Sequence, residues 1–296
     1  MEDKSFKWMN RVIGVQLLAY LILGIASIVL HQDFYAVYLS LFCVAGVFLM
    51  IFQGVPMLGA RNMVMFYLDG VLVSFFFEAS GANYGWFFSK YTYTEVMLIG
   101  PQIWGVSFLP FLAYGALPYV IFAIAQAIVG QYDNVFRKGD VLLIPAVGAF
   151  LMTAIDFATD PLMASMGGSH LWEEHGVFYG IPIQNYIGWY LFAFVMLLIP
   201  SVILWYQYRG GCLPARPEAS RRKRFWLYPT LIYGLLFVQH LFYIFNGDDR
   251  TVVTYNGSEL LTRDIYQGTA LISFATLVGY SLFACVKVCR EERLTK

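Results

Sequence analysis

Uncharged apolar runs, separated by short polar segments, recur along the whole chain. A helix needs roughly 20 mostly apolar residues to cross a bilayer, and eight runs come near that length. They cover residues 12–30, 35–53, 63–79, 102–129, 139–157, 187–206, 225–246 and 267–288. The pattern leaves no room for a soluble domain. It predicts one integral membrane domain over residues 1–296, an all-α, polytopic bundle of about eight transmembrane helices.

The distribution of Lys and Arg supports the same number of spans. Sixteen of the 19 fall in segments that the eight-span topology places on one side, and only Lys90, Arg250 and Arg263 fall on the other. Short cytoplasmic loops collect Lys and Arg. We therefore predict that both termini are cytoplasmic and that the protein is a multi-pass protein of the cell membrane.

Composition agrees with this prediction. Hydrophobic residues make up 59% of the chain and charged residues only 13%, whereas soluble domains are about half apolar and a quarter charged. The net charge is zero, and the basic stretch 216–224 is typical of a loop that touches anionic lipid headgroups. We expect membrane lipids as partners and no nucleic acid.

Two irregular features are predicted. Pro110 and Pro118 lie inside the fourth apolar run, where proline removes a backbone hydrogen bond and bends the helix. On the predicted outer side, three loops at about 80–101, 158–186 and 247–266 hold much of the unusual chemistry. The loop 158–186 is rich in glycine and aromatic residues, and we expect it to fold back over the bundle as a lid.

Carboxyl groups at the edge of apolar runs are the first candidates for chemistry, because charge is costly there unless it is paired or used. Asp156 and Asp160 are four residues apart, so an extended fifth helix would place both on one face. One of two close, dry carboxyl groups keeps its proton, which leaves an acid beside a base. Glu78, near the outer end of the third helix, is expected at the same depth. The alternative is that Asp160 merely ends the helix and Glu78 reaches the interface.

A second acidic cluster lies inside the lid loop. His170, Glu173, Glu174 and His175 form the order H-x-x-E-E-H, which differs from the zinc motifs H-E-x-x-H and H-x-x-E-H. We therefore expect no metal site, although Asp156 or Asp160 could complete one.

Polar and aromatic side chains near the acids are candidate substrate contacts. Gln239, His240 and Tyr243 lie together on the seventh helix, where they would either contact substrate or bond neighbouring helices. Aromatic faces attract cations, although aromatic residues also form the interfacial belt of membrane proteins. The aromatic candidates are Tyr91, Tyr93, Trp172, Tyr179 and Trp189.

Two motifs carry a resemblance to a known family. Residues 172–189 read W-x3-G-x-FYG-x-P-x2-N-x2-GW, and residues 78–93 read E-x2-G-x3-G-x2-F-x2-Y-x-Y. With the motif at 78–93 first in the chain and Asp160-Pro161 between the two, they resemble the CruF-type membrane carotenoid hydratases. The resemblance implies addition of water to the terminal C1–C2 double bond of a carotenoid ψ-end group, without a cofactor. The substrates would be a lipophilic isoprenoid and water.

The chemistry of the residues suits this reaction. A carboxyl group of Asp156 or Asp160 would protonate the alkene, and Glu78 or the other Asp would handle the water. Asn185 would orient them by hydrogen bonds. Two alternatives stay open at this point. The same protonated alkene could be quenched internally by a cyclase or isomerase, and embedded acids also occur in small-molecule or ion-coupled transporters.

Overall fold

The computed structural model describes residues 4–32, 34–95, 97–98, 100–246, 251–253 and 259–295. Part of the predicted outer loop 247–266 therefore lies outside the described residues. Within the described ranges, eight helical segments are long and apolar enough to cross a membrane. They are Phe6–Leu30, Val37–Leu58, Ala60–Tyr84, Leu109–Val129, Asp140–Met166, Ile183–Arg209, Lys223–Phe245 and Thr262–Arg290. The predicted all-α bundle of eight spans is confirmed.

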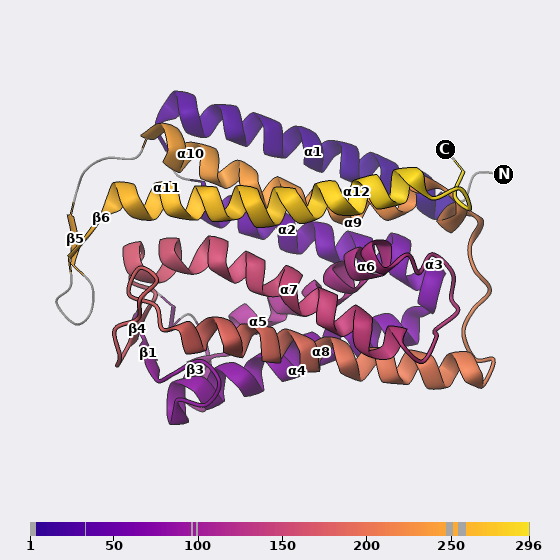
Figure 1. Ribbon diagram of the computed structural model, residues 1–296, viewed down its shortest axis with the longest axis horizontal. Helices are drawn as coiled ribbons and strands as arrows, with labels where there is room; N and C mark the ends of the chain where they lie inside the picture. Colours follow the sequence, from indigo (N-terminus) through magenta and orange to yellow (C-terminus); the bar gives the residue numbers. More distant parts are fainter. Residues whose placement is uncertain are drawn as a thin grey trace.

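The spans are built from helices that break or change winding at several points (Figure 1). The α-helices are α1 (Lys4–Leu30), α2 (Tyr35–Leu49), α3 (Val55–Leu58), α4 (Ala60–Tyr84), α5 (Leu109–Tyr114), α6 (Leu117–Val129), α7 (Asp140–Asp160), α8 (Ile183–Arg209), α9 (Lys223–Leu235), α10 (Gln239–Asn246), α11 (Thr262–Ser273) and α12 (Gly279–Arg290). π-Helical turns occupy Met50–Gly54, Pro161–Met166 and Phe274–Val278, and 3₁₀ turns occupy Glu218–Arg221 and Leu236–Val238.

In the part of the chain that the structure describes, six short strands form three antiparallel pairs outside the helices. They are β1 (Tyr91–Tyr93), β2 (Gln102–Ile103), β3 (Val106–Ser107), β4 (His170–Trp172), β5 (Thr251–Val253) and β6 (Glu259–Leu261). Both chain ends lie at one end of the bundle, and β1 and β4 lie at the other (Figure 1). This arrangement agrees with an even number of spans, while the side of the membrane that each end faces stays a prediction.

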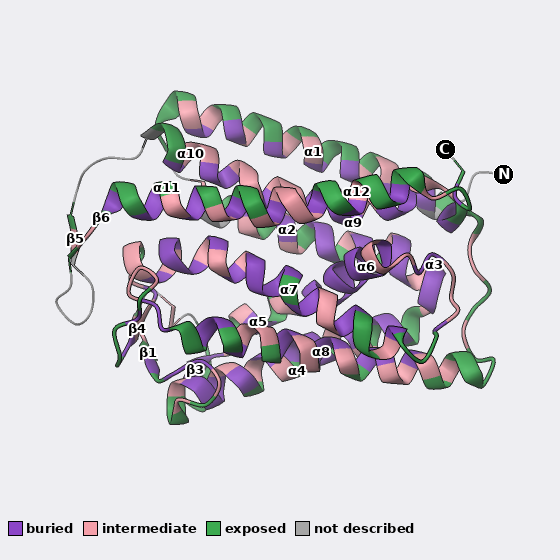
Figure 2. Cartoon of the chain, viewed as in Figure 1, coloured by how far each residue is buried: buried purple, intermediate pink, exposed green. Residues whose placement is uncertain are grey.

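The helices differ in how far their residues are buried. Every residue of α6 from Leu117 to Ala127 is buried, as expected for a helix that is hydrophobic on all sides. In contrast, α1 has exposed residues along its length (Figure 2), and they include large apolar ones such as Val15, Leu18 and Leu21. Such a surface is stable where lipid is the solvent, and it supports the assignment of a membrane protein.

The fourth span is broken as its prolines predict. Helix α5 ends at Tyr114, and α6 begins two residues beyond Gly115, with Pro118 in its first turn. Proline is tolerated there because its missing N–H has no helical partner. A side chain in place of Gly70 on α4 would lie within 3.0 Å of Pro118 and of the Tyr114 carbonyl. This close contact holds the break against α4.

The start of this span was predicted wrongly. The apolar run begins at residue 102, but the chain forms the β2–β3 hairpin first and becomes helical only at Leu109. Gly100 and Gly105, at φ of +79° and +75°, mark the turns, and the hairpin satisfies backbone groups locally. Apolar residues alone do not distinguish such a hairpin from a helical turn.

The predicted lid loop becomes a small cap at the end of the bundle. Its first part, to Met166, continues the α7 span as a π-helical turn. Strand β4 then pairs with β1 from the first outer loop, with Tyr91 opposite Trp172 and Tyr93 opposite His170. The cap thus joins two loops that are about 80 residues apart in the chain, and it positions the tyrosines of β1 over α4.

Candidate active site

Helix α7 presents both of the predicted aspartates on one face. Asp156 and Asp160 are 2% and 7% exposed, and their carboxyl groups are close enough to share a hydrogen bond. Pro161 does not end the span, because the chain continues as a π-helical turn to Met166. Asp160 is the last residue of α7, but the helical span goes on beyond it, so this aspartate does not lie at the end of the span. π-Helical turns inside α-helical spans often accompany functional sites.

Asn185 ties the two carboxyl groups together. It lies in the first turn of α8, and its side-chain Nδ2 donates to Asp156 Oδ2 at 3.0 Å and to Asp160 Oδ2 at 2.8 Å. Asn185 itself is buried. Helix α8 reaches this position because Gly188 packs on the backbone of Phe87, where an added Cβ would lie 2.4 Å from the Phe87 oxygen. This explains why a glycine is needed near the acids in the motif at residues 172–189.

Glu78 is held by the two tyrosines of β1. The hydroxyl groups of Tyr91 and Tyr93 both donate to Glu78 Oε2, the latter at 2.8 Å. Burial, with the nearby Glu78 carboxylate, raises the pKa of both phenols, so they keep their protons and act as donors. Glu78 is also close enough to Asp156 and Asp160 to interact with them electrostatically. The structure thus brings all three predicted acids into one site.

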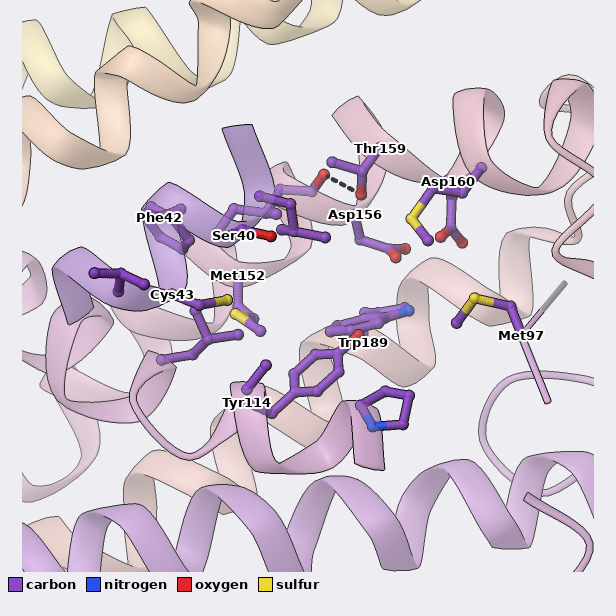
Figure 3. Close-up of a pocket in the computed structure, with 17 residues that line it drawn as sticks. Ser40, Phe42, Cys43, Met97, Tyr114, Met152, Asp156, Thr159, Asp160 and Trp189 are labelled. Atoms are coloured by element: carbon purple, nitrogen blue, oxygen red, sulfur yellow. Dashed lines mark hydrogen bonds between the residues drawn. The ribbon is translucent and has the colours of Figure 1, made fainter. Parts of the chain in front are cut away.

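A cavity of about 430 Å³ lies against the two aspartates. In Figure 3 their carboxyl groups point toward it, while the rings of Trp189 and Tyr114 lie across from them. The remaining lining is mostly apolar and comes from α2, α5, α6 and α7, with Met97 from the outer loop. The volume is in the range of roughly 300–1,000 Å³ that is usual for small-molecule sites. We call it the large cavity.

A small cavity of about 30 Å³ adjoins it on the side of Glu78. Glu78, Tyr93 and Ser107 supply its polar groups, and Met97, Pro110 and Tyr114 line both cavities. A water molecule needs at least about 10–15 Å³ and two to four polar partners. The small cavity meets both requirements for a single water.

The other predicted contacts lie away from the large cavity. Trp172 supports Tyr91, with ring centroids 6.1 Å apart, and donates to the Phe88 carbonyl at 3.2 Å. The hydroxyl of Tyr179 donates to the Asp264 carbonyl at 3.0 Å and packs on Gly268 of α11. Both residues stabilise the cap instead of lining the cavity.

The polar stripe of the seventh helix is also displaced from the acids. His240 lies 2.9 Å from Ser273 on α11 and 3.3 Å from Gln239. Tyr243 packs on Tyr266, also on α11, with ring centroids 4.7 Å apart. Among the described residues, none of the three predicted contacts on this helix lines the large cavity. The structure favours interhelical hydrogen bonding and packing for this stripe.

The histidines and glutamates of the cap are spread apart by β4. The His170 ring packs on Tyr91 and Trp172, and its Nδ1 lies 2.8 Å from Ser169 Oγ. Glu173 instead pairs with Lys90 at 2.7 Å on the exposed side, and Glu174 and His175 are exposed. Within the described ranges, no three His, Cys, Asp or Glu side chains gather as a metal site.

The protonation of His170 should control the stability of the cap. Burial lowers the pKa of His170 from 6.5 to about 4, so the folded cap binds this proton only in stronger acid than the unfolded chain does. Stability should therefore fall as the pH drops from about 6.5 to 4. We expect His170→Gln to reduce this loss, seen as a smaller drop in Tm, by a few degrees, between pH 7 and 4.5 in detergent.

The matched control is His175→Gln, because His175 lies in the same cap and is exposed. It should lose as much Tm in acid as the unmodified protein. An equal acid effect in the His170 variant would show that other groups cause it.

Several residues of the site carried no signal in the sequence. Tyr114, Ser107 and Met97 line the cavities but belong to no polar motif. Val44, with its neighbours on α2, comes from a span with no charged residue in it. In this part of the chain, the sequence predicted only that Pro110 and Pro118 bend the fourth span.

These observations define a multi-pass membrane protein with buried carboxyl groups beside an apolar cavity. A model of the family described as carotenoid biosynthesis protein matches residues 37–212. The match covers more than half of the chain, including all three acids and Asn185. The chain therefore belongs to this family, in agreement with its resemblance to the CruF-type proteins, and has a role in carotenoid biosynthesis. No curated protein and no solved structure matches it.

Proposed function

We propose that the protein hydrates the terminal C1–C2 double bond of an acyclic carotenoid end group by acid–base catalysis. The observation that carries this proposal is the position of the acids. A carboxyl pair joined by Asn185 faces an apolar cavity, and a third carboxylate lies beside an adjoining cavity of water size. The acid, the hydrocarbon and the water thus have separate places.

The aspartate pair is the proton donor. A hydrogen bond between two carboxyl groups requires a proton on one of them, and Asn185 donates to both without supplying charge. Transfer of this proton to C2 leaves a tertiary carbocation at C1 and both aspartates of the pair as carboxylates. The negative charge formed on the pair stabilises the cation across the short gap.

Aromatic rings stabilise the same cation. Trp189 and Tyr114 both line the large cavity opposite the aspartates, and their ring centroids are 6.4 Å apart. Aromatic faces attract cations within about 6 Å, with a gain near 2 kcal/mol or more when water is excluded.

Glu78 activates the water. Tyr91 and Tyr93 hold its Oε2, which fixes the carboxylate at the wall of the small cavity. The water oxygen bonds to C1, its proton passes to Glu78, and Glu78 then gives this proton up to restore the one that the aspartate pair lost. The balance is one water added, one tertiary alcohol formed and no change in oxidation state.

The test is expression in bacteria that accumulate lycopene or another acyclic carotenoid, with the pigments separated and weighed by mass spectrometry. We expect a new, more polar pigment that is heavier by one water, and two such additions where both ends react. An empty-vector strain is the control. A new pigment of unchanged mass would indicate cyclisation or isomerisation instead, and an unchanged pigment profile would contradict the proposal.

A further inference from the structure

The large cavity reaches from the acids to the outer surface of the bundle. At one end lie Asp156 and Asp160, and at the other lie residues of α2, with Phe42, Ser40 and Cys43 on the far side from Asp160 in Figure 3. The cavity is therefore elongated between α7 and α2. The two carboxyl groups lie at one end only.

The end beside α2 is open to the side. Val44 on α2 lines the cavity and is 46% exposed, and Ser40 on α2 and Ala113 on α5 also line it and are exposed. All three lie within membrane-spanning segments. We call this mouth, formed by Ser40, Val44 and Ala113, the α2–α5 opening.

The packing of the two helices explains the opening. Helix α2 packs on α1, α6 and α9, whereas α5 packs mainly on α4. The break at Gly115 divides the span into α5 and α6, and only α6 lies deep in the bundle. Each helix thus packs against its neighbours on the side away from the cavity, and the space between the cavity-lining faces of α2 and α5 leads to the outside of the bundle.

We propose that the α2–α5 opening is the entrance for the isoprenoid chain, whose end group reaches the aspartates while the rest of the polyene stays in the bilayer. This inference rests on the proposed function for the identity of the reacting end. The occupant must be a lipid-soluble hydrocarbon, because the mouth lies within the spans and is lined mainly by apolar groups. A cavity of about 430 Å³ has the volume of a drug-sized ligand, so it holds one end of a long polyene.

The α2–α5 opening determines which part of a substrate the protein can discriminate. Only the part of a substrate inside the pocket is discriminated by its walls. Acyclic carotenoids that share an end group but differ in length should therefore be converted at rates within about threefold of one another, because their differences lie beyond the opening.

The test places a bulky side chain in the mouth. Val44→Trp and Ala113→Trp should each lower both the polyene that co-purifies with the protein and the fraction converted by about tenfold or more, because overpacking a contact costs a few kcal/mol. The controls are Val47→Trp and Leu112→Trp. These positions lie on the same helices, are each 42% exposed and are not among the lining residues. Bound polyene is measured by visible absorbance per protein in mild detergent.

The two readouts separate this inference from the proposed function. Polyene binding that is lost only in the two mouth variants supports the entrance, whatever product the unmodified protein makes. Mouth variants that bind and convert polyene like their controls would overturn it. So would purified protein that carries phospholipid and no polyene.

Discussion

Asp156→Asn and Asp160→Asn should each abolish nearly all conversion of the carotenoid, with a loss of roughly 10²–10⁴-fold, the usual contribution of a general acid. Either change removes a carboxyl group from the pair that holds the proton. The amide has nearly the same shape, and its oxygen still accepts the hydrogen bond from Asn185, so the fold and the cavity are retained. Conversion is measured as the fraction of pigment altered per amount of protein.

The two aspartates should behave as one unit. Residues that act together give effects that do not add, so the double variant should be no slower than the slower single variant. Both single variants should still carry polyene after purification, because neither change blocks the α2–α5 opening. Asp140→Asn, at the far end of the same helix, is the control and should leave conversion unchanged. Hydrated pigment at the normal level in both single variants would disprove the acid assignment.

Most of the fold could be predicted because the bilayer imposes it. A spanning segment must satisfy its own backbone and must be apolar over about 20 residues, so eight runs gave eight spans. The ends of the spans were less predictable. The hairpin before Leu109 is as apolar as a helical turn, and the π-helical turn from Pro161 to Met166 continues a span that was predicted to end at residue 157.

The site was predictable only where local spacing determines it. Asp156 and Asp160 share a helix face, so four residues of separation were enough to pair them. The pairing of Tyr91 with Trp172 depends on contact between two distant loops, and the lining by α2 depends on how helices pack. Neither the strand pairing nor the lining by α2 can be predicted from sequence periodicity. Gln239 and His240 were predicted as substrate contacts because the sequence does not distinguish a polar residue that binds substrate from one that bonds a neighbouring helix. In the structure His240 lies against Ser273.

Glu78→Gln should change the product instead of stopping the reaction. The aspartate pair still forms the carbocation, but the side chain that accepts the proton from water is gone, so hydrated pigment should fall about 10²-fold or more. The cation then loses a proton or is attacked by a neighbouring double bond. We expect pigments of unchanged mass and altered retention time or absorption, measured by chromatography with mass spectrometry.

Two milder variants test whether the small cavity holds the water. Tyr93→Phe removes one hydrogen bond to Glu78, and Ser107→Ala removes one polar group from the cavity wall. A hydrogen bond contributes about 0.5–1.5 kcal/mol, so each should lower the ratio of hydrated to unhydrated product by several fold.

The contrast between the two sets of variants assigns the roles. Loss of the acid prevents every product, because no cation forms, whereas loss of Glu78 leaves the cation without water and preserves products of unchanged mass. If Glu78→Gln gave unaltered substrate only, as expected of the aspartate variants, Glu78 would belong to the proton donor. The small cavity would then not be the source of the water.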